Sequence, residues 1–313
     1  MKWIPIFMAA WLLLIRPAVY GWSQPGHMII AAMAYDELSE GDRTKLDAIL
    51  RNHVKYETWA AEYPANGLSD LTKEKFVAML ASLYPDEIRN YHNPETFGYW
   101  HFADYPLCPP DFPMKLRPLP GNDVVSGITD SEDAVAKLDK PADAATRAKM
   151  LSYLIHLVGD IHQPLHCANW FDTRFPDGDK GGNKAFVRPP GEAPMRLHAY
   201  WDQLFGPGAP ALHAPPVTMI LAADHLAIDL AQRFQRADLP ELSTHLTPEE
   251  WSLESRESAI KDVWLSSKLA CSADESNAPE LPADYRDNAH QVAEHRAALA
   301  GHRLADRLHA ILR

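Results

Sequence analysis

The sequence contains little cysteine: Cys108, Cys167 and Cys271 are the only three in 313 residues. No two of them have the Cys-x-x-Cys spacing of a zinc-finger framework. If the chain is exported, one disulfide and one free thiol is the simplest arrangement. We expect the disulfide between Cys108 and Cys271, because Cys167 directly follows His166, a candidate metal ligand.

Long apolar runs are absent after the first twenty residues, so no later stretch is long enough to cross a membrane. At the start, Lys2 precedes an apolar run at 3–15 that ends shortly before Gly21. This pattern is typical of a secretory signal peptide and is too short for a membrane span. We expect residues 1–21 to be removed, leaving 22–313 as a periplasmic or secreted protein without a membrane anchor. An uncleaved anchor is the alternative.

Acceptor sites for N-glycosylation, Asn-x-Ser/Thr, are also absent, which favours a bacterial source. Basic residues are outnumbered, with 30 Lys and Arg against 42 Asp and Glu, a net charge of −12. Loss of Lys2 and Arg16 with the leader would make the charge more negative. Such a protein should repel nucleic acid and phosphates, unless bound divalent ions reverse the charge locally. Composition alone therefore leaves the substrate open.

Alternation typical of strands is nearly absent, and there are no repeats or low-complexity linkers. Apolar residues recur at helical spacing, and a hydrophobic content of 46% supports a sizeable core. We therefore predict one all-α, multi-helix domain with long loops. The helices are expected at 29–38, 39–52, 71–83, 131–138, 142–161, 198–205, 217–236, 248–271 and 282–313. Residues 106–127 should form a loop, and 172–194 a loop or a small hairpin.

The stretch from His156 to His166 carries the strongest indication of chemistry. His156 and Asp160 are four residues apart, so on a helix both side chains leave the same face. Pro164 should end that helix and direct His166 separately. An imidazole and a carboxylate placed in this way can hold a divalent metal ion.

His198 and Asp202 repeat the same four-residue spacing. One such pair alone is more often a surface pair, or a carboxylate that only orients the histidine. Two pairs together with His166 are more typical of a multinuclear metal site.

Further motifs strengthen this interpretation: Trp22 with His27, Pro85-Asp86-Glu87-Ile88-Arg89, Trp100-His101-Phe102, Gly181-Gly182-Asn183 and the segment 300–305. With these motifs the chain resembles the zinc-dependent, single-strand-specific nucleases of fungi, plants and bacteria. That family shares a superfamily with the bacterial zinc phospholipases C. The resemblance covers most of the mature chain.

The resemblance implies three bound zinc ions. It assigns one ion to Asp86, His101, His156 and Asp160; a second to the α-amine and carbonyl of Trp22, His27 and the shared Asp160; and the third to His166, His198 and Asp202. The amine of Trp22 becomes a ligand only after cleavage at Gly21. Glu62 is an alternative to Asp86, whose spacing to His101 fits the family better. His162 matches no ligand position and should be packed or support a ligand.

The resemblance also implies roles in catalysis and substrate binding. Asp86 and Asp160 would hold the ions that activate water, and Arg89 would contact the phosphate; the alternative for Arg89 is a surface salt bridge. Phe102 would stack on a nucleobase, although it could simply pack in the core. Asp104 would accept hydrogen bonds from the base edge, and Asn183 would line the cleft.

The function implied is hydrolysis of single-stranded RNA and DNA to 5′-phosphate products, and of 3′-phosphates on nucleotides, by a monomer. A phospholipase C is the first alternative. The short gap between Trp22 and His27, Asp202 in place of Glu, and the base-binding character of Phe102 and Asp104 argue against it. A non-catalytic zinc-binding protein is the second alternative, and Arg89 with Phe102 disfavours it.

Overall fold

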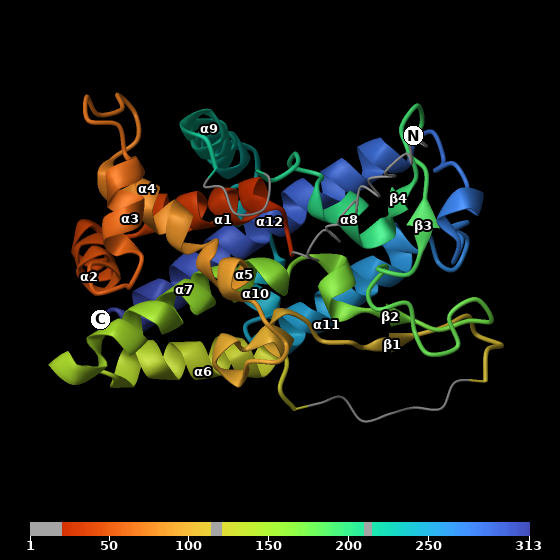
Figure 1. Cartoon of the computed structure of the whole chain (residues 1–313), viewed down its shortest axis with the longest axis horizontal. Coiled ribbons are helices and arrows are strands. Elements are labelled where there is room, and N and C mark those ends of the chain that lie inside the picture. The colour runs from red at the N-terminus through yellow and green to blue at the C-terminus, as the bar shows by residue number, and fades with distance from the viewer. Residues whose placement is uncertain (1–20, 114–120, 210–214) are drawn as a thin grey trace, which may run out of the picture.

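A computed structural model describes residues 21–113, 121–209 and 215–313 (Figure 1). All of the predicted signal peptide except Gly21 lies outside the described residues. The chain is mostly helical and forms one domain, which confirms the predicted all-α class. In the described part of the chain, no helix combines the length and the apolar character needed to cross a membrane.

The α-helices are α1 (Gln24–Glu37), α2 (Glu40–Leu50), α3 (Tyr56–Glu62), α4 (Lys73–Ala81), α5 (Tyr84–Ile88), α6 (Val124–Lys137), α7 (Ala144–Asp160), α8 (Leu197–Asp202), α9 (Val217–Arg233), α10 (Glu241–Thr244), α11 (Pro248–Ser258) and α12 (Tyr285–Ile311). Short 3₁₀ turns include η2 (Gly98–His101) and η4 (Pro164–Cys167). The strands are β1 (Pro106–Leu107), β2 (Asn169–Trp170), β3 (Phe186–Val187) and β4 (Met195–Arg196).

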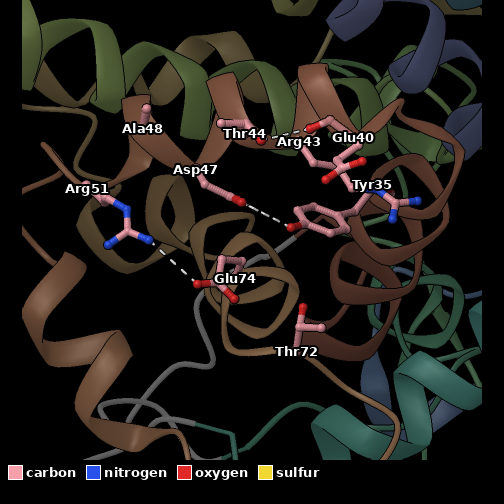
Figure 2. A pocket seen from close by; sticks show the side chains of 9 residues that line it. All are labelled: Tyr35, Glu40, Arg43, Thr44, Asp47, Ala48, Arg51, Thr72 and Glu74. Atoms are coloured by element: carbon pink, nitrogen blue, oxygen red, sulfur yellow. Dashed lines mark hydrogen bonds and ion pairs between the residues drawn. The ribbon is translucent and has the colours of Figure 1, made fainter.

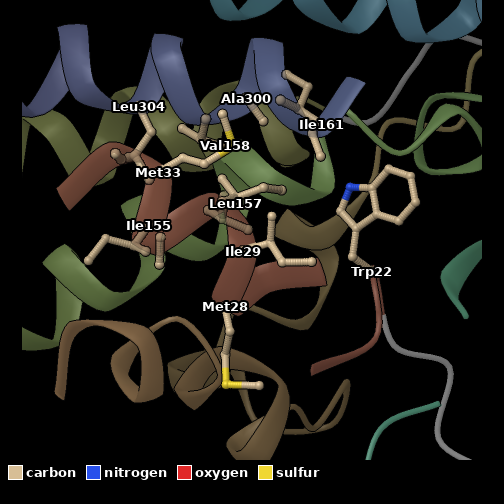
Figure 3. Close-up of a cluster of buried hydrophobic side chains, with 14 of the residues drawn as sticks. Trp22, Met28, Ile29, Met33, Ile155, Leu157, Val158, Ile161, Ala300 and Leu304 are labelled. Carbon is tan, nitrogen blue, oxygen red and sulfur yellow. The ribbon is translucent and has the colours of Figure 1, made fainter. Parts of the chain in front are cut away.

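Helix α1 lies at the centre of the core, between α7 and α12 (Figures 1 and 3). Its Ile29 and Met33 are almost completely buried, and so are Val158 of α7 and Leu304 of α12. Gly301 lets α12 approach closely, because a Cβ there would lie 2.7 Å from the Cβ of Met33. Since α1 and α7 also carry His27, His156 and Asp160, the best-packed part of the molecule positions the candidate metal ligands.

Among the predicted boundaries, those of α6 and α11 differ most from the structure. The loop expected at 106–127 ends earlier, because Asp123 and Ser126 form a capping box that starts α6 at Val124. The helix expected at 248–271 also ends early: α11 continues as a π-helical turn at Ala259–Val263, and the backbone from Leu265 to Ser267 is left-handed. Three such residues in a row end the helix.

Of the two alternatives predicted for 172–194, a loop or a small hairpin, the structure has the hairpin, and its second strand lies just after this segment. Strands β3 and β4 pair antiparallel, with Phe186 opposite Arg196. Strands β1 and β2 pair in parallel and tie the segment after Tyr105 to the end of η4.

The predicted disulfide between Cys108 and Cys271 is wrong for this structure, in which all three cysteines are free. The side chain of Cys271 is engaged elsewhere: the guanidinium of Arg174 donates to its Sγ at 3.1 Å and to its carbonyl at 2.8 Å. Cys167 is completely buried.

A pocket that includes several charged side chains in its lining lies between α1, α2 and α4 (Figure 2). Several of its polar groups pair with one another: the hydroxyl of Tyr35 donates to Asp47 at 3.2 Å, and Arg51 pairs with Glu74 at 3.6 Å. None of the predicted ligands lines this pocket, so the candidate site lies elsewhere.

Candidate metal centre

The last turn of α7 places His156 and Asp160 side by side, as their spacing predicted. Both side chains are fully buried, and His156 Nε2 lies 3.0 Å from Asp160 Oδ2. His156 Nδ1 donates to the carbonyl of Ser82 at 2.7 Å. This hydrogen bond fixes the tautomer and leaves Nε2 as the atom able to bind a metal.

A first group of donor atoms forms around this pair. His101, from the end of η2, brings its Nδ1 to 2.9 Å from Asp160 Oδ2 and 3.1 Å from His156 Nε2. Asp86 Oδ1, from α5, lies 3.7 Å from the same atom of His101 and 3.8 Å from His156 Nε2. Three separate segments, α5, η2 and α7, thus direct two imidazoles and two carboxylates at one point.

A second group begins with His27 of α1. Its Nε2 lies 3.5 Å from Asp160 Oδ1, and its ring stacks on His156 at 3.9 Å between centroids. Both ring nitrogens of His27, and Asp160 Oδ1, have no hydrogen-bond partner among the described residues. A buried polar group left in this way costs about 1–3 kcal/mol, which a bound cation would offset.

The predicted first residue of the mature chain lies at the same point. Trp22 is fully buried, and its Nε1 donates to the carbonyl of Gly159 at 3.1 Å. A Cβ on Gly21 would overlap the carboxylate of Asp160 and lie 3.0 Å from Cε1 of His166. The backbone around the predicted cleavage point therefore runs against Asp160.

The third group joins His166 of η4 to His198 and Asp202 of α8. His198 Nε2 lies 3.5 Å from Asp202 Oδ2, and the rings of the two histidines are 5.1 Å apart. Backbone carbonyls accept from both Nδ1 atoms, which orients the Nε2 atoms towards the centre of the group. Gln163 donates to Asp202 Oδ1 at 2.7 Å. Sequence reasoning assigned Gln163 no role, although it lies between two histidines of the central motif.

Burial determines the protonation of these groups. It lowers the pKa of His27, His101 and His166, and neighbouring cationic groups lower it further. These imidazoles are therefore neutral, the form that binds metal. Burial lowers the pKa of His156 too, but the charges of Asp160 and Asp86 outweigh burial and raise it overall.

Burial also acts on two carboxylates of the interior, Asp160 and Asp202. Burial raises the pKa of Asp160 to about 6, and it raises that of Asp202 well above its usual range. A divalent cation would reverse both shifts. The three groups supply imidazole nitrogen and carboxylate oxygen, the donors that zinc takes in proteins, so the residues present fit zinc.

Comparison with known proteins agrees with this geometry. The model of the S1/P1 nuclease family matches residues 22–313. The chain belongs to the S1/P1 nuclease family. Its match to "Endonuclease 2" of Arabidopsis thaliana is 24% identical over 208 residues, covering 64% of this chain and 61% of that protein. The match to "Endonuclease 1" of the same plant is 24% identical over 193 residues, covering 59% and 54%. The chain thus matches less than two thirds of the length of either relative.

In this member of the S1/P1 family, Arg89 lies beside the first group. Its side chain is only 6% exposed, and a terminal nitrogen lies 3.4 Å from Asp86 Oδ1. Burial lowers the pKa of Arg89, but the charge of Asp86 and its neighbours raises it overall. The predicted alternative, an ordinary surface salt bridge, does not fit this burial.

Of the residues predicted to bind the base, Phe102 and Asp104 lie close to His101 in the sequence, whereas Asn183 lines a separate pocket. Phe102 directly follows His101 and is half-buried. Burial raises the pKa of the neighbouring Asp104 to about 6. Asn183 donates to the carbonyl of Lys180 at 2.8 Å and lines a pocket that contains none of the predicted ligands. Its substrate-binding role therefore stays a prediction.

Two other residues lie outside the three groups. His162 donates through Nδ1 to the carbonyl of Val158 at 2.7 Å and accepts from Arg303 at Nε2 at 2.8 Å. It is a buried histidine just after α7 that links the end of α7 to α12, in agreement with the prediction that it is packed or supports a ligand. Glu62, the alternative to Asp86, ends α3 and belongs to none of the three groups.

Proposed function

We propose that the chain is a zinc-dependent phosphodiesterase that hydrolyses single-stranded RNA and DNA to 5′-phosphate products and removes 3′-phosphates from nucleotides. The observation that carries the proposal is the gathering of mostly buried imidazoles and carboxylates in the interior, where Asp160 faces His27 on one side and His101 and His156 on the other, with Arg89 next to them. Membership of the S1/P1 nuclease family supports the nuclease assignment. We also propose a count of three zinc ions, one for each group.

The candidate residues would have separate roles in binding zinc and in binding the phosphate. Asp86, His101, His156 and Asp160 would hold one ion, Trp22 and His27 with Asp160 the second, and His166, His198 and Asp202 the third. Bound zinc would polarise the phosphate and lower the pKa of a coordinated water. Arg89 would bind a phosphate oxygen and offset the charge that develops in the transition state.

The base of the substrate would be held separately from the phosphate. Phe102 would stack on it, and Asp104 would accept hydrogen bonds from its edge, while Asn183 would line the cleft. Stacking accepts every base but requires a base that is already unstacked, so single strands would be preferred. No covalent intermediate is needed: burial raises the pKa of Cys167, the thiol closest to the ligands in sequence, and keeps it protonated.

The test uses mature protein that starts at Trp22 and is fully loaded with zinc. Single-stranded RNA, single-stranded DNA and phosphatidylcholine vesicles are incubated with it, with and without a chelator. We expect chelator-sensitive release of 5′-nucleotides and an unchanged lipid. Release of the lipid headgroup alone would assign a phospholipase C. Absence of any turnover with three bound zinc ions would leave a non-catalytic zinc protein.

We further propose that the chain is exported as a monomer and that removal of residues 1–21 completes the second group. Protein that keeps Gly21 should then bind one zinc ion fewer than mature protein, because the nitrogen of Trp22 stays in a peptide bond. Its activity should fall by at least about 10- to 100-fold. Mass spectrometry verifies the N-terminus, metal analysis gives the zinc per chain, and an assay on single-stranded DNA gives the activity. A glycine added after Arg313 is the control, and equal zinc content in all three proteins would refute the requirement for cleavage.

A further inference from the structure

Two exposed tyrosines flank the candidate site. Among the large hydrophobic side chains that the described residues expose, Tyr91 and Tyr99 are the aromatic ones, 45% and 51% exposed. Tyr91 follows Arg89 by two residues, and Tyr99 precedes His101 by two. Exposed tyrosines are common on proteins, so exposure alone does not indicate a binding role for these two; their arrangement relative to Phe102 does.

The two rings continue a row that begins at Phe102. The ring centroids of Tyr99 and Phe102 are 6.4 Å apart at an interplanar angle of 69°. Those of Tyr91 and Tyr99 are 5.5 Å apart at 62°. Phe102, Tyr99 and Tyr91 therefore form one continuous aromatic strip, which we call the aromatic row, leading from the residue after a metal ligand out to solvent.

The backbone that carries the aromatic row is packed against the core. The backbone of Gly98 lies directly against Tyr91, because a Cβ on Gly98 would be 2.9 Å from a ring carbon of Tyr91. Phe97, before Gly98, has a left-handed backbone, and its ring stacks on the buried Trp100 at 4.0 Å. The turn that carries Tyr99 is thus anchored in the core, while the two tyrosine rings stay accessible.

The charge of the protein indicates which ligand the row suits. A net charge of −12 gives little attraction for the phosphates of a strand away from the metal ions. Stacking on aromatic rings needs no positive charge and accepts any base. Bases that follow the one at Phe102 would meet Tyr99 and then Tyr91.

We propose that Tyr99 and Tyr91 bind successive bases of a single-stranded substrate beyond the base at Phe102, so that the enzyme favours strands over dinucleotides. This proposal rests on the proposed nuclease function. The contribution of each ring should be about 5- to 100-fold in affinity, the range measured for stacking of single bases on aromatic side chains.

The test compares a dinucleoside monophosphate with an unstructured hexanucleotide as substrates of the zinc-loaded mature enzyme. Tyr91→Ala and Tyr99→Ala should each raise the KM for the hexanucleotide by about 5- to 100-fold and leave kcat and the dinucleotide kinetics unchanged. Tyr91→Phe and Tyr99→Phe keep the ring and should behave like wild type. Leu253→Ala removes a similarly exposed side chain, 43% exposed on α11, and is the control.

Binding of a phosphorothioate hexanucleotide, followed by fluorescence anisotropy, gives a readout independent of turnover and should weaken by the same factor. Equal KM values for wild type and the alanine variants, or equal losses on both substrates, would overturn the proposal. Wild type that cleaves neither substrate would instead refute the nuclease function. Zinc content and thermal unfolding of each variant identify any loss that comes from misfolding.

Discussion

Asp160→Asn should lower nuclease activity by at least about 1,000-fold and remove zinc from two groups at once. The reason is that Asp160 is shared. Its Oδ2 lies 2.9 Å from His101 Nδ1 and 3.0 Å from His156 Nε2, while its Oδ1 faces His27 Nε2 at 3.5 Å. An amide has about the same size but lacks the negative charge and presents a donor where a ligand atom is required.

Zinc per chain, measured by elemental analysis, and steady-state kinetics on single-stranded DNA test this expectation. Asp229→Asn is the matched control, because Asp229 also pairs with a residue four positions away, Arg233, but is 54% exposed. It should keep full zinc and full activity. An Asp160→Asn protein with a normal zinc content would contradict the shared-ligand assignment.

Glu254→Ala should destabilise the fold by about 3–5 kcal/mol, because it leaves two buried arginines without their counter-ion. Glu254 of α11 accepts from Arg296 at 2.9 Å and from Arg303 at 2.6 Å, both on α12. The arginine side chains are only 6% and 3% exposed. Urea unfolding at pH 7 measures the loss.

Glu257→Ala is the control, three residues along the same helix. Glu257 is 68% exposed and pairs with Arg256, so its removal should cost about 0–1 kcal/mol. Similar losses for the two variants would mean that burial does not control the strength of these pairs.

The effect of Glu254 should also depend on pH. Burial raises its pKa, but the hydrogen bond from Arg303 and the charges of both arginines outweigh burial and lower it overall. A depressed carboxylate pKa stabilises the fold above the unfolded value and loses that contribution as pH falls through the folded value. The stability difference between wild type and Glu254→Ala should therefore shrink as pH drops below about 4.5. A constant difference down to pH 3 would contradict this assignment.

Local spacing in the sequence predicted the parts of the site that are local in space. The i, i+4 pairs on α7 and α8 follow from helix geometry alone. Asp86 and His101 join His156 only through tertiary packing, so for these residues the family resemblance was needed. Gln163 was missed because nothing in its own spacing marks a side chain that positions Asp202.

For the fold, too, features set by local sequence patterns were predicted better than those that depend on contacts between distant segments. Helices α9 and α12 have long periodic patterns and were predicted almost completely. The start of α6 was missed because its Asp123–Ser126 capping box follows a segment rich in proline and glycine. The disulfide prediction failed because pairing depends on the approach of distant segments, and Arg174 occupies the sulfur of Cys271 instead.

The position of Gly21 against Asp160 has a consequence for the cell that makes the protein. A hydrolase of single-stranded RNA is a hazard in the compartment of its own synthesis, where messenger RNA is abundant. In the proposed precursor, the nitrogen of Trp22 would be an amide and the second group would lack a ligand. The proposed cleavage on export would therefore also activate the enzyme, and the host's transcripts would be spared without a separate inhibitor protein.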